Sequence, residues 1–329
     1  MTNSNKNRVL VFGASGQLGS RIMEILAREQ IPAVAFLRKG SNYQPPESGQ
    51  TIIHTGDLAD ADSVREACAG EVTHVIATAS SIVPRPGDAF GAHDLLFYHN
   101  ILDGCRAGGI KHLVYISAFP SPHDDQVPEF VIKREVEQLI IQSGIPYTIF
   151  RGAAFMDVYF AVMGSSLALE GVAHPTLLRG YWLTRLWSKM TSGILEKYGI
   201  ALVPGNGKAR QAFISIDDVA RCMVRVLDLP ATRNRVFELA GPEGRSWREV
   251  ADIYAELLGR RVFKLPLPIW LLHLLEGLFR RASPAGANMM SILALLARYE
   301  YTPDMTPLCR ELGVELTDIR TFIKRKKEC

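Results

Sequence analysis

The sequence predicts an α/β fold: a doubly wound parallel sheet with helices on both faces, followed by a smaller and mostly helical C-terminal region. Two observations carry this expectation. Apolar runs of strand length alternate with helical patterns through the first half of the chain, which is typical of parallel strands joined by crossover helices. A glycine-rich turn follows the first of these runs and leads directly into a helical pattern. With 329 residues, 47% of them hydrophobic, the chain is long enough to bury a large core.

Six short apolar runs are the expected strands, at residues 8–12, 31–37, 51–54, 73–78, 112–117 and 147–150. Helical patterns lie between most of them, and one of these covers residues 128–143. In such sheets, ligands bind in the crevice beyond the carboxyl ends of the strands. The residues that directly follow each strand are therefore the candidates for a binding site.

The turn after the first strand predicts a Rossmann-type dinucleotide site. One glycine permits the tight turn, one lets the backbone approach a pyrophosphate, and one lets the helix pack close to the strand. The N–H groups at the start of the helix then hold the phosphates. A plain structural turn is the alternative interpretation. The predicted contacts are Gly13, Ser15, Gly16, Gln17, Leu18 and Gly19.

The end of the second strand indicates which dinucleotide is bound. An acidic residue there would accept a hydrogen bond from the ribose 2′-hydroxyl of NAD, but this chain has Arg38 and Lys39. Two cations suit a 2′-phosphate, so we predict NADP(H). The alternative is that both are solvated loop charges.

The third and fourth strands add further cofactor candidates. Asp57, followed by Leu58, is placed to accept a hydrogen bond from the adenine amino group, or else to cap a helix that begins near Ala59. After the fourth strand, small side chains would let the cofactor lie against the backbone. These residues are Ala77, Thr78 and Ala79.

The fifth strand ends near Ser117, and Lys133 lies sixteen residues later within the expected helix 128–143. The apolar residues of that helix predict a buried stripe, from which Lys133 is absent. Taken alone, Lys133 is therefore a surface lysine in a charged stretch. The predicted stripe consists of Ile132, Val136, Leu139 and Ile140.

These motifs together resemble the short-chain dehydrogenase/reductase superfamily, in particular its atypical branch of isoflavone-reductase-like and nitrogen-metabolite-repression-regulator-like proteins. The resemblance extends over about residues 8–262. Besides the glycine turn, it is based on residues 56–57, 133–137, 143–151, 213–220 and 237–242.

The resemblance implies roles for several residues. The superfamily moves protons with a serine, a tyrosine and a lysine, and here Ser117 and Lys133 match two of these positions while Glu129 stands in the tyrosine position. Lys133 is implied to bind the cofactor and to assist hydride transfer, and Ser117 is the second catalytic candidate. Gly152 and Phe155 are implied to border the nicotinamide.

The chain is expected to divide into two regions. Residues 1–155 are the predicted NADP-binding domain, to which a strand and a helix return at about 211–240. Residues 156–329 are the predicted substrate or partner region. The aromatic and aliphatic stretch at 156–198 is either the wall of a pocket for a small apolar or aromatic substrate, ordinary packing, or a partner surface.

Composition excludes several functional classes. The formal net charge is only +3, and the basic residues 324–327 are expected to be a solubilising terminus, so we expect no nucleic-acid partner. The five cysteines lack metal-ligand spacing and indicate reduced thiols, no metal and a cytoplasmic location. The N-terminus has no apolar segment of a secretory signal.

The apolar run at 265–275 is too short to span a bilayer, although it suits a membrane surface or a homodimer interface. His273 within it is expected to be a satisfied or surface-facing histidine.

The predicted function is hydride transfer from NADP(H) to a small apolar carbonyl, quinone or activated double bond, without the usual tyrosine. The alternative is a non-catalytic NADP(H)-binding redox sensor or assembly factor that acts through a protein partner. A nucleotide-sugar or steroid epimerase/dehydrogenase is a third possibility, which the absent tyrosine disfavours.

Overall fold

A seven-stranded parallel sheet lies at the centre of the computed structural model, which describes residues 8–47, 50–80, 91, 93–172, 174–178 and 182–328. The strand order is β3-β2-β1-β4-β5-β6-β9. The order reverses between β1 and β4, and ligands of open parallel sheets bind at this point. The predicted doubly wound sheet is confirmed.

The six strands predicted from the sequence lie within two residues of their expected bounds. Helices cover both faces of the sheet, which explains why β1 and β2 are almost continuously apolar. The seventh strand comes from the second half of the chain. The strands are β1 (Arg8–Phe12), β2 (Ala33–Leu37), β3 (Thr51–Thr55), β4 (Val72–Ala77), β5 (His112–Ala118), β6 (Tyr147–Gly152) and β9 (Arg235–Leu239).

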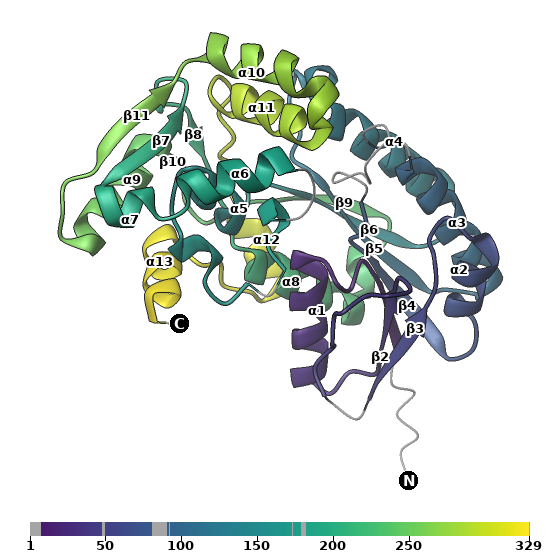
Figure 1. Ribbon diagram of the computed structural model, residues 1–329. Coiled ribbons are helices and arrows are strands. Elements are labelled where there is room, and N and C mark those ends of the chain that lie inside the picture. The colour runs from purple at the N-terminus through teal and green to yellow at the C-terminus, as the bar shows by residue number, and fades with distance from the viewer. Residues whose placement is uncertain are drawn as a thin grey trace.

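Two layers of helices enclose the sheet (Figure 1). On one face lie α1 (Gln17–Arg28) and α8 (Ile216–Arg225), and on the other lie α2 (Ala61–Cys68), α3 (Asp94–Ala107) and α4 (Pro128–Gln142). Alternate residues of β1 supply the two cores: Val9 and Val11 face one layer, and Leu10 and Phe12 face the other.

The second half of the chain is mostly helical, as expected, with two small sheets that the sequence did not indicate. Strand β7 (Ile200–Pro204) pairs in parallel with β11 (Phe263–Leu267), and β8 (Arg210–Gln211) pairs antiparallel with β10 (Arg245–Ser246). The helices are α5 (Met156–Val162), α6 (Trp182–Thr191), α7 (Ile194–Tyr198), α9 (Trp247–Leu258), α10 (Ile269–Ala282), α11 (Pro284–Leu296), α12 (Thr306–Leu312) and α13 (Ile319–Glu328).

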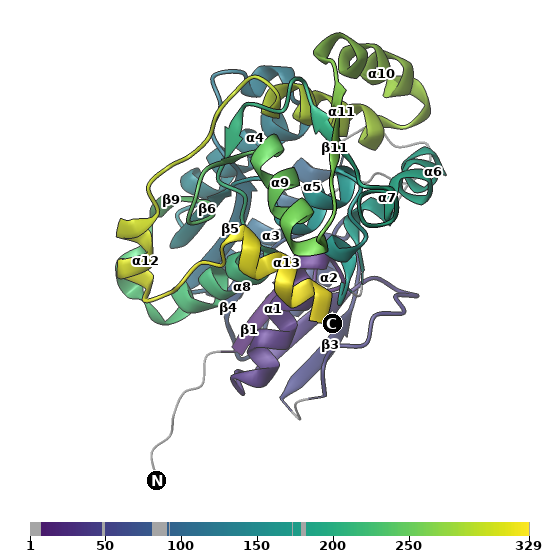
Figure 2. The ribbon, with the colours of Figure 1, turned by 90° about the vertical axis from the view of Figure 1, so that its left-hand side faces the viewer.

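Figure 2 shows this second half stacked beside the carboxyl edge of the sheet, with α10 at one extremity. Within the described ranges, none of the helices combines the length and apolar character needed to cross a bilayer.

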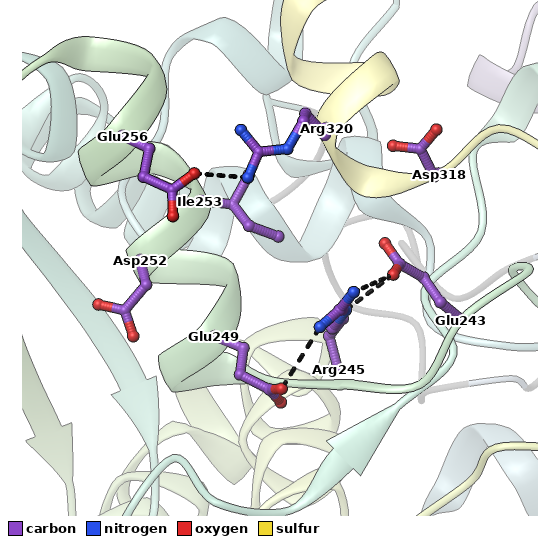
Figure 3. A pocket seen from close by; sticks show the side chains of 8 residues that line it. All are labelled: Glu243, Arg245, Glu249, Asp252, Ile253, Glu256, Asp318 and Arg320. Carbon is purple, nitrogen blue, oxygen red and sulfur yellow. Dashed lines mark hydrogen bonds and ion pairs between the residues drawn. The ribbon is translucent and has the colours of Figure 1, made fainter.

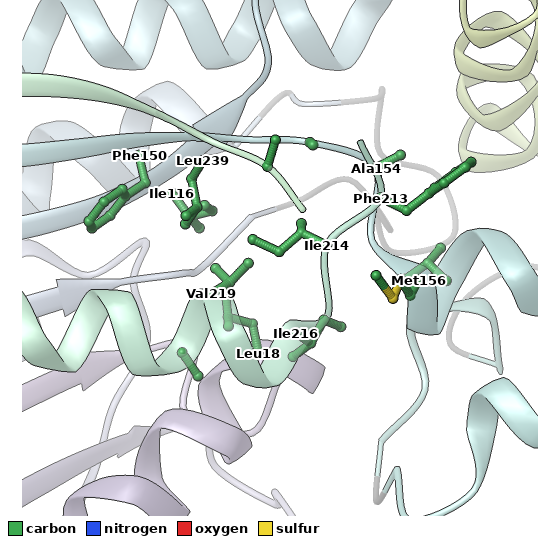
Figure 4. Packing of buried hydrophobic residues seen from close by; sticks show 14 of the residues in the cluster. Leu18, Ile116, Phe150, Ala154, Met156, Phe213, Ile214, Ile216, Val219 and Leu239 are labelled. Atoms are coloured by element: carbon green, nitrogen blue, oxygen red, sulfur yellow. The ribbon is translucent and has the colours of Figure 1, made fainter. Parts of the chain in front are cut away.

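One hydrophobic core joins the two halves (Figure 4). Leu18 of α1, Phe150 of β6 and Val219 of α8 pack together with Leu239 of β9 and Met156 of α5. The predicted division at residue 155 therefore passes through a continuous core, and the separation into two domains remains a prediction.

Ser215 caps the start of α8: its Oγ accepts a hydrogen bond from the backbone N–H of Asp218 at 3.1 Å. The carboxylate of Asp218 is buried and accepts the backbone N–H of Thr317 at 2.7 Å. The short strand expected before α8 is only a bridge between Phe155 and Ile214.

The basic C-terminal residues are also not the free solubilising terminus that we expected. Helix α13 folds against the second half, and Lys326 forms an ion pair with the buried Asp157 at 3.1 Å. Cys68, Cys105, Cys222 and Cys309 are free thiols, whereas Cys329 lies outside the described residues. His273 is exposed beside Glu276, as predicted.

Candidate functional site

The glycine turn has no room for side chains at two of its three glycines. A Cβ atom on Gly19 would lie 2.0 Å from the carbonyl oxygen of Gly13, and one on Gly13 would lie 2.7 Å from the backbone nitrogen of Ala79. Gly13 also has a φ of +87°, which L side chains rarely adopt. The turn therefore brings β1, the start of α1 and the end of β4 into direct backbone contact.

The start of α1 provides donors for an anion. Gly16 is the N-cap and its N–H bonds to the Gly13 carbonyl at 2.8 Å. The N–H groups of Gln17, Leu18 and Gly19 precede the first carbonyl that an α-helix can offer them. Their position at the positive end of the helix suits a phosphate.

The side chain of Gln17 contributes one more donor. Its Oε1 accepts hydrogen bonds from the backbone N–H and the hydroxyl of Thr176 at 3.0 and 2.9 Å. Its Nε2 is buried and has no hydrogen-bond acceptor among the described residues. A buried donor without an acceptor is costly, so this geometry fits a ligand that supplies an oxygen at the turn.

Arg38 and Lys39 follow the carboxyl end of β2, as predicted, and both are exposed. The N–H of Ser41 bonds to the carbonyl of Arg38 at 3.0 Å, which closes a turn there. Neither cation forms an ion pair with a residue that the structure describes. Both side chains are therefore exposed cations directly after β2, where the sequence predicts a ribose phosphate.

Asp57 does not cap α2. That helix begins at Ala61, and its cap is Asp60, whose Oδ1 accepts the N–H of Asp62 at 3.1 Å. Asp57 accepts the N–H of Ala59 at 3.0 Å and so shapes the turn before the helix. The carbonyl of Leu58 accepts a hydrogen bond from Asn100 at 2.8 Å, which holds this turn against α3.

The end of β4 lies against the glycine turn. The backbone N–H and the hydroxyl of Thr78 both donate to the carbonyl of Phe12, at 2.9 and 3.1 Å. Ala77 and Ala79 are buried on either side of it. These three residues, Gly13 and the start of α1 thus lie together at the switch point, as predicted from the sequence.

Lys133 is buried, with 8% of its surface exposed, so the expectation that it lies off the buried face of α4 is wrong. Its Nζ donates to the carbonyl of Ile116 at 3.1 Å and lies 5.1 Å from the ring centre of Tyr115. Burial lowers the pKa of its ammonium, and the charge of Glu129 opposes that shift. This burial is not compatible with the alternative that Lys133 is a solvated lysine on the surface.

Glu129 lies one turn before Lys133, in the first turn of α4. Its Oε2 accepts a hydrogen bond from Nδ2 of Asn288 at 2.9 Å, and its backbone N–H donates to Oδ1 of the same side chain at 3.1 Å. Burial raises the pKa of Glu129, against the opposing effects of Lys133 and Asn288. Asn288 belongs to α11, so this pair joins the two halves of the chain.

Ser117 belongs to an ion-pair network. Its Oγ accepts a hydrogen bond from Arg134 at 3.0 Å. Arg134 also pairs with Asp124 at 2.8 Å and with the fully buried Glu137 at 2.5 Å, and Arg151 pairs with Glu137 at 2.6 Å. The catalytic role of Ser117 stays a prediction, and this geometry gives it a structural task instead.

Gly152 ends β6, and its carbonyl accepts the N–H of Phe119 at 2.9 Å. Phe155 is half-buried and precedes α5. On α5, half-buried Tyr159 has a raised pKa because of burial first and the charge of Glu129 second. Glu129 of α4 thus contacts Asn288 of α11 and is near enough to Tyr159 of α5 for its charge to act on that hydroxyl.

Sequence reasoning missed three members of this site. Glu137 and Arg134 were visible only as part of a charged stretch, although the spacing of four between Lys133 and Glu137 places both on one helical face. Asn288 gave no signal, because it lies 159 residues from its partner Glu129.

A separate open depression of about 380 Å³ lies between α9 and the start of α13 (Figure 3). It is lined by charged side chains that pair with one another: Arg245 with Glu243 and Glu249, and Arg320 with Glu256. Since the lining holds five carboxylates and only these two arginines, its charge is unfavourable for phosphates, and we do not assign the nucleotide site here.

Comparison with known proteins shows what the chain is similar to. Residues 13–161 match the family described as NAD(P)H-binding. A photosystem II assembly factor of Cyanophora paradoxa is 29% identical over 81% of this chain and 73% of its own length. A phenylcoumaran benzylic ether reductase of Betula pendula is 25% identical over 80% and 79%.

Solved structures share the fold. An NADPH-dependent quinone oxidoreductase of Escherichia coli, complexed with NADPH, has a TM-score of 0.68 and 20% identity, and the match covers 97% of this chain and 99% of that one. A nucleoside-diphosphate-sugar epimerase of Staphylococcus aureus has a TM-score of 0.73 and 19% identity over 97% and 99%. Residues 13–161 therefore match the NAD(P)H-binding family, and an isoflavone reductase-like protein is among the relatives of the chain.

Proposed function

We propose that this protein is an NADP(H)-dependent reductase that acts on a small apolar carbonyl, quinone or activated double bond. The observation that carries the proposal is the buried Lys133, whose ammonium lies at the end of β5 next to the switch point of the sheet. The phenylcoumaran benzylic ether reductases among its relatives support the same class of activity.

The chain's own residues would hold the cofactor in three places. The N–H groups at the start of α1 and Nε2 of Gln17 would bind the pyrophosphate. Arg38 and Lys39 would bind a ribose 2′-phosphate, which is the basis for preferring NADP(H) to NAD(H). When bound, the reduced nicotinamide supplies a hydride.

Lys133 would assist the change of charge during reduction. An ammonium has three N–H donors, and one of them is used by the carbonyl of Ile116. A positive charge held in place before the reaction stabilises negative charge that develops on a substrate oxygen. The same group can orient the nicotinamide ribose through a hydrogen bond.

The surroundings favour an apolar substrate. Phe155 and Tyr159 are only partly buried and pack against the main core, so part of each remains exposed near the ends of β5 and β6. An apolar or aromatic ligand would cover this surface with a gain of about 25 cal/mol per Å² of apolar area.

The test is turnover by the purified protein. We expect loss of NADPH absorbance with at least one compound from a panel of quinones, enones and aromatic ketones, and at least tenfold slower turnover in Lys133→Met. Lys111→Met is the matched control, because Lys111 is exposed at the opposite end of β5. NADPH binding without turnover across the panel would contradict the proposal.

A second candidate is an NADP(H)-binding protein that acts through a protein partner without turnover. The observation that favours it is an exposed apolar stripe on α10, where Trp270, Leu274 and Leu278 have 67%, 60% and 69% of their surface accessible. The likeness to assembly factors also favours it. In this case NADPH would bind and the panel would give no turnover.

A further inference from the structure

We infer that Glu129 is the proton donor of the reduction, in the place where the tyrosine of the superfamily is missing. This inference rests on the proposed reductase function. The geometry behind it is a carboxyl group of α4 that is held by Asn288 of α11 and lies near Tyr159 of α5.

The first step of the argument is how firmly Glu129 is held. Asn288 is buried, with 2% of its surface exposed, and both atoms of its amide bind Glu129: Nδ2 donates to the carboxyl, and Oδ1 accepts the backbone N–H. A buried amide used entirely in this way fixes the orientation of the carboxyl. Glu129 as a residue is half-buried, and its carboxyl group lies at the protein interior, where burial raises its pKa.

The second step is the charge around the carboxyl. Lys133 lies one turn further along the same helix, and its positive charge lowers the pKa of Glu129. The charge of Glu129 in turn contributes to the raised pKa of Tyr159 on α5. Asp94 is a further carboxylate close enough to act on both Glu129 and Lys133. Burial and Asp94 favour the protonated form of Glu129, while Lys133 and the Asn288 amide favour the ionised form.

The third step is the chemistry. A bound reduced nicotinamide would supply the hydride and its electron pair to the substrate carbon, and the substrate oxygen would then need a proton. The O–H bond of the Glu129 carboxyl breaks as the new O–H bond on the substrate forms. The carboxylate left behind lies beside the Lys133 ammonium, and it takes up a proton from solvent before the next turnover.

The pH dependence of kcat tests this assignment. Since the donor must be protonated, kcat should fall as the pH rises through the pKa of Glu129. We expect Glu129→Gln to lower kcat by about 100-fold or more and to abolish this fall, with little change in the NADPH dissociation constant measured by fluorescence. Asn288→Ala removes a donor to the carboxylate, so it should move the fall to higher pH.

The matched control is Glu135→Gln, because Glu135 is exposed on the same helix. A measurement that does not depend on turnover is ¹³C NMR of the glutamate carboxyl groups. The resonance that disappears in Glu129→Gln identifies Glu129, and in the wild-type protein it should titrate above the ordinary glutamate range.

The outcomes separate the two proposals. If the wild type turns over substrate and Glu129→Gln has the same pH profile of kcat, this inference is wrong and the reductase function still holds. The same conclusion follows if the Glu129 carboxyl titrates in the ordinary glutamate range. If the contact between Glu129 and Asn288 only holds α11 against α4, Glu129→Gln and Asn288→Ala should both lower the free energy of unfolding and keep the wild-type pH profile of kcat. The absence of turnover in the wild type overturns both.

Discussion

Lys326 of α13 forms a 3.1 Å ion pair with Asp157 of α5, and the second carboxyl oxygen of Asp157 accepts the backbone N–H of Ile216 at 3.0 Å. One carboxylate thus connects the C-terminal helix, α5 and the start of α8. We expect Lys326→Met to lower the free energy of unfolding by about 1–3 kcal/mol, because it leaves a buried carboxylate without its cation. Urea denaturation measures this, with Lys324→Met as the exposed control. Equal losses in both variants would contradict the prediction.

Arg38 and Lys39 should determine the choice between the two nicotinamide cofactors. Replacing both with alanine should weaken NADPH binding by about tenfold or more and leave NADH binding nearly unchanged, because only NADPH carries the 2′-phosphate. Titration of intrinsic fluorescence at low and high salt measures both affinities. A parallel loss for NADH would mean that these residues do not recognise the phosphate.

Gly19→Ala should disrupt the dinucleotide turn. The new Cβ would lie 2.0 Å from the carbonyl oxygen of Gly13, so β1 and α1 would have to move apart. We expect loss of NADPH binding and a stability loss of about 1–3 kcal/mol. Gly277→Ala is the control, since that helical glycine has open space around its Cβ position and alanine should stabilise α10 by up to about 1 kcal/mol.

Gln17→Leu should weaken the binding of either cofactor by removing the buried Nε2 donor. The same change leaves Thr176 without the acceptor of its two hydrogen bonds, so its effect has two sources. Thr176→Val removes only the hydroxyl donor. If the Nε2 group binds the cofactor, calorimetry should show a larger loss of affinity for Gln17→Leu than for Thr176→Val.

Two buried histidines should make the protein sensitive to mild acid. Burial lowers the pKa of His74 to about 4 and that of His112 to about 3, below their ordinary value of 6.5. As the pH falls below 6.5, both histidines take up a proton in the unfolded chain but not in the folded protein. The free energy of unfolding is therefore highest above pH 6.5 and decreases as the pH falls toward 4. Between pH 7 and pH 5 we expect a loss of roughly 1–2 kcal/mol for each histidine.

Matched variants isolate this effect. The hydroxyl of Thr73 forms a hydrogen bond with Nδ1 of His74, and His74→Asn keeps a polar partner for it. The hydroxyl of Thr148 forms a hydrogen bond with Nε2 of His112, and His112→Gln keeps a polar partner for it. Urea denaturation of His74→Asn and His112→Gln should show a smaller difference between pH 7 and pH 5 than the wild type. An unchanged difference would assign the acid sensitivity to other groups.

Local patterns were enough to predict which residues lie together at the candidate nucleotide site. The glycine turn, the residues after β2 and the small residues after β4 are all short motifs next to apolar strands, and a parallel sheet places their ends together. Lys133 was misplaced because the apolar pattern alone defined the buried face. A lysine can share that face where opposite charges such as Glu129 lie nearby.

Contacts between distant parts of the chain were not predictable. Thr176 binds Gln17 and Asn288 binds Glu129, each across 159 residues, and no local pattern encodes such pairs. The local sequence also does not decide which residue caps α8. Ser215 and the two aspartates after it are all good capping residues, and the choice among them depends on Arg21 and Thr317 elsewhere in the fold.

Strand β9 also has a consequence for the synthesis of the protein. It covers the outer edge of β6, yet it follows the whole segment from α5 to α8 in the chain. While the ribosome translates that segment, the nascent sheet exposes the unpaired backbone of β6, including the apolar Ile149 and Phe150. An open edge of this kind invites pairing with other chains, so newly made protein is exposed to aggregation until Leu239 has emerged.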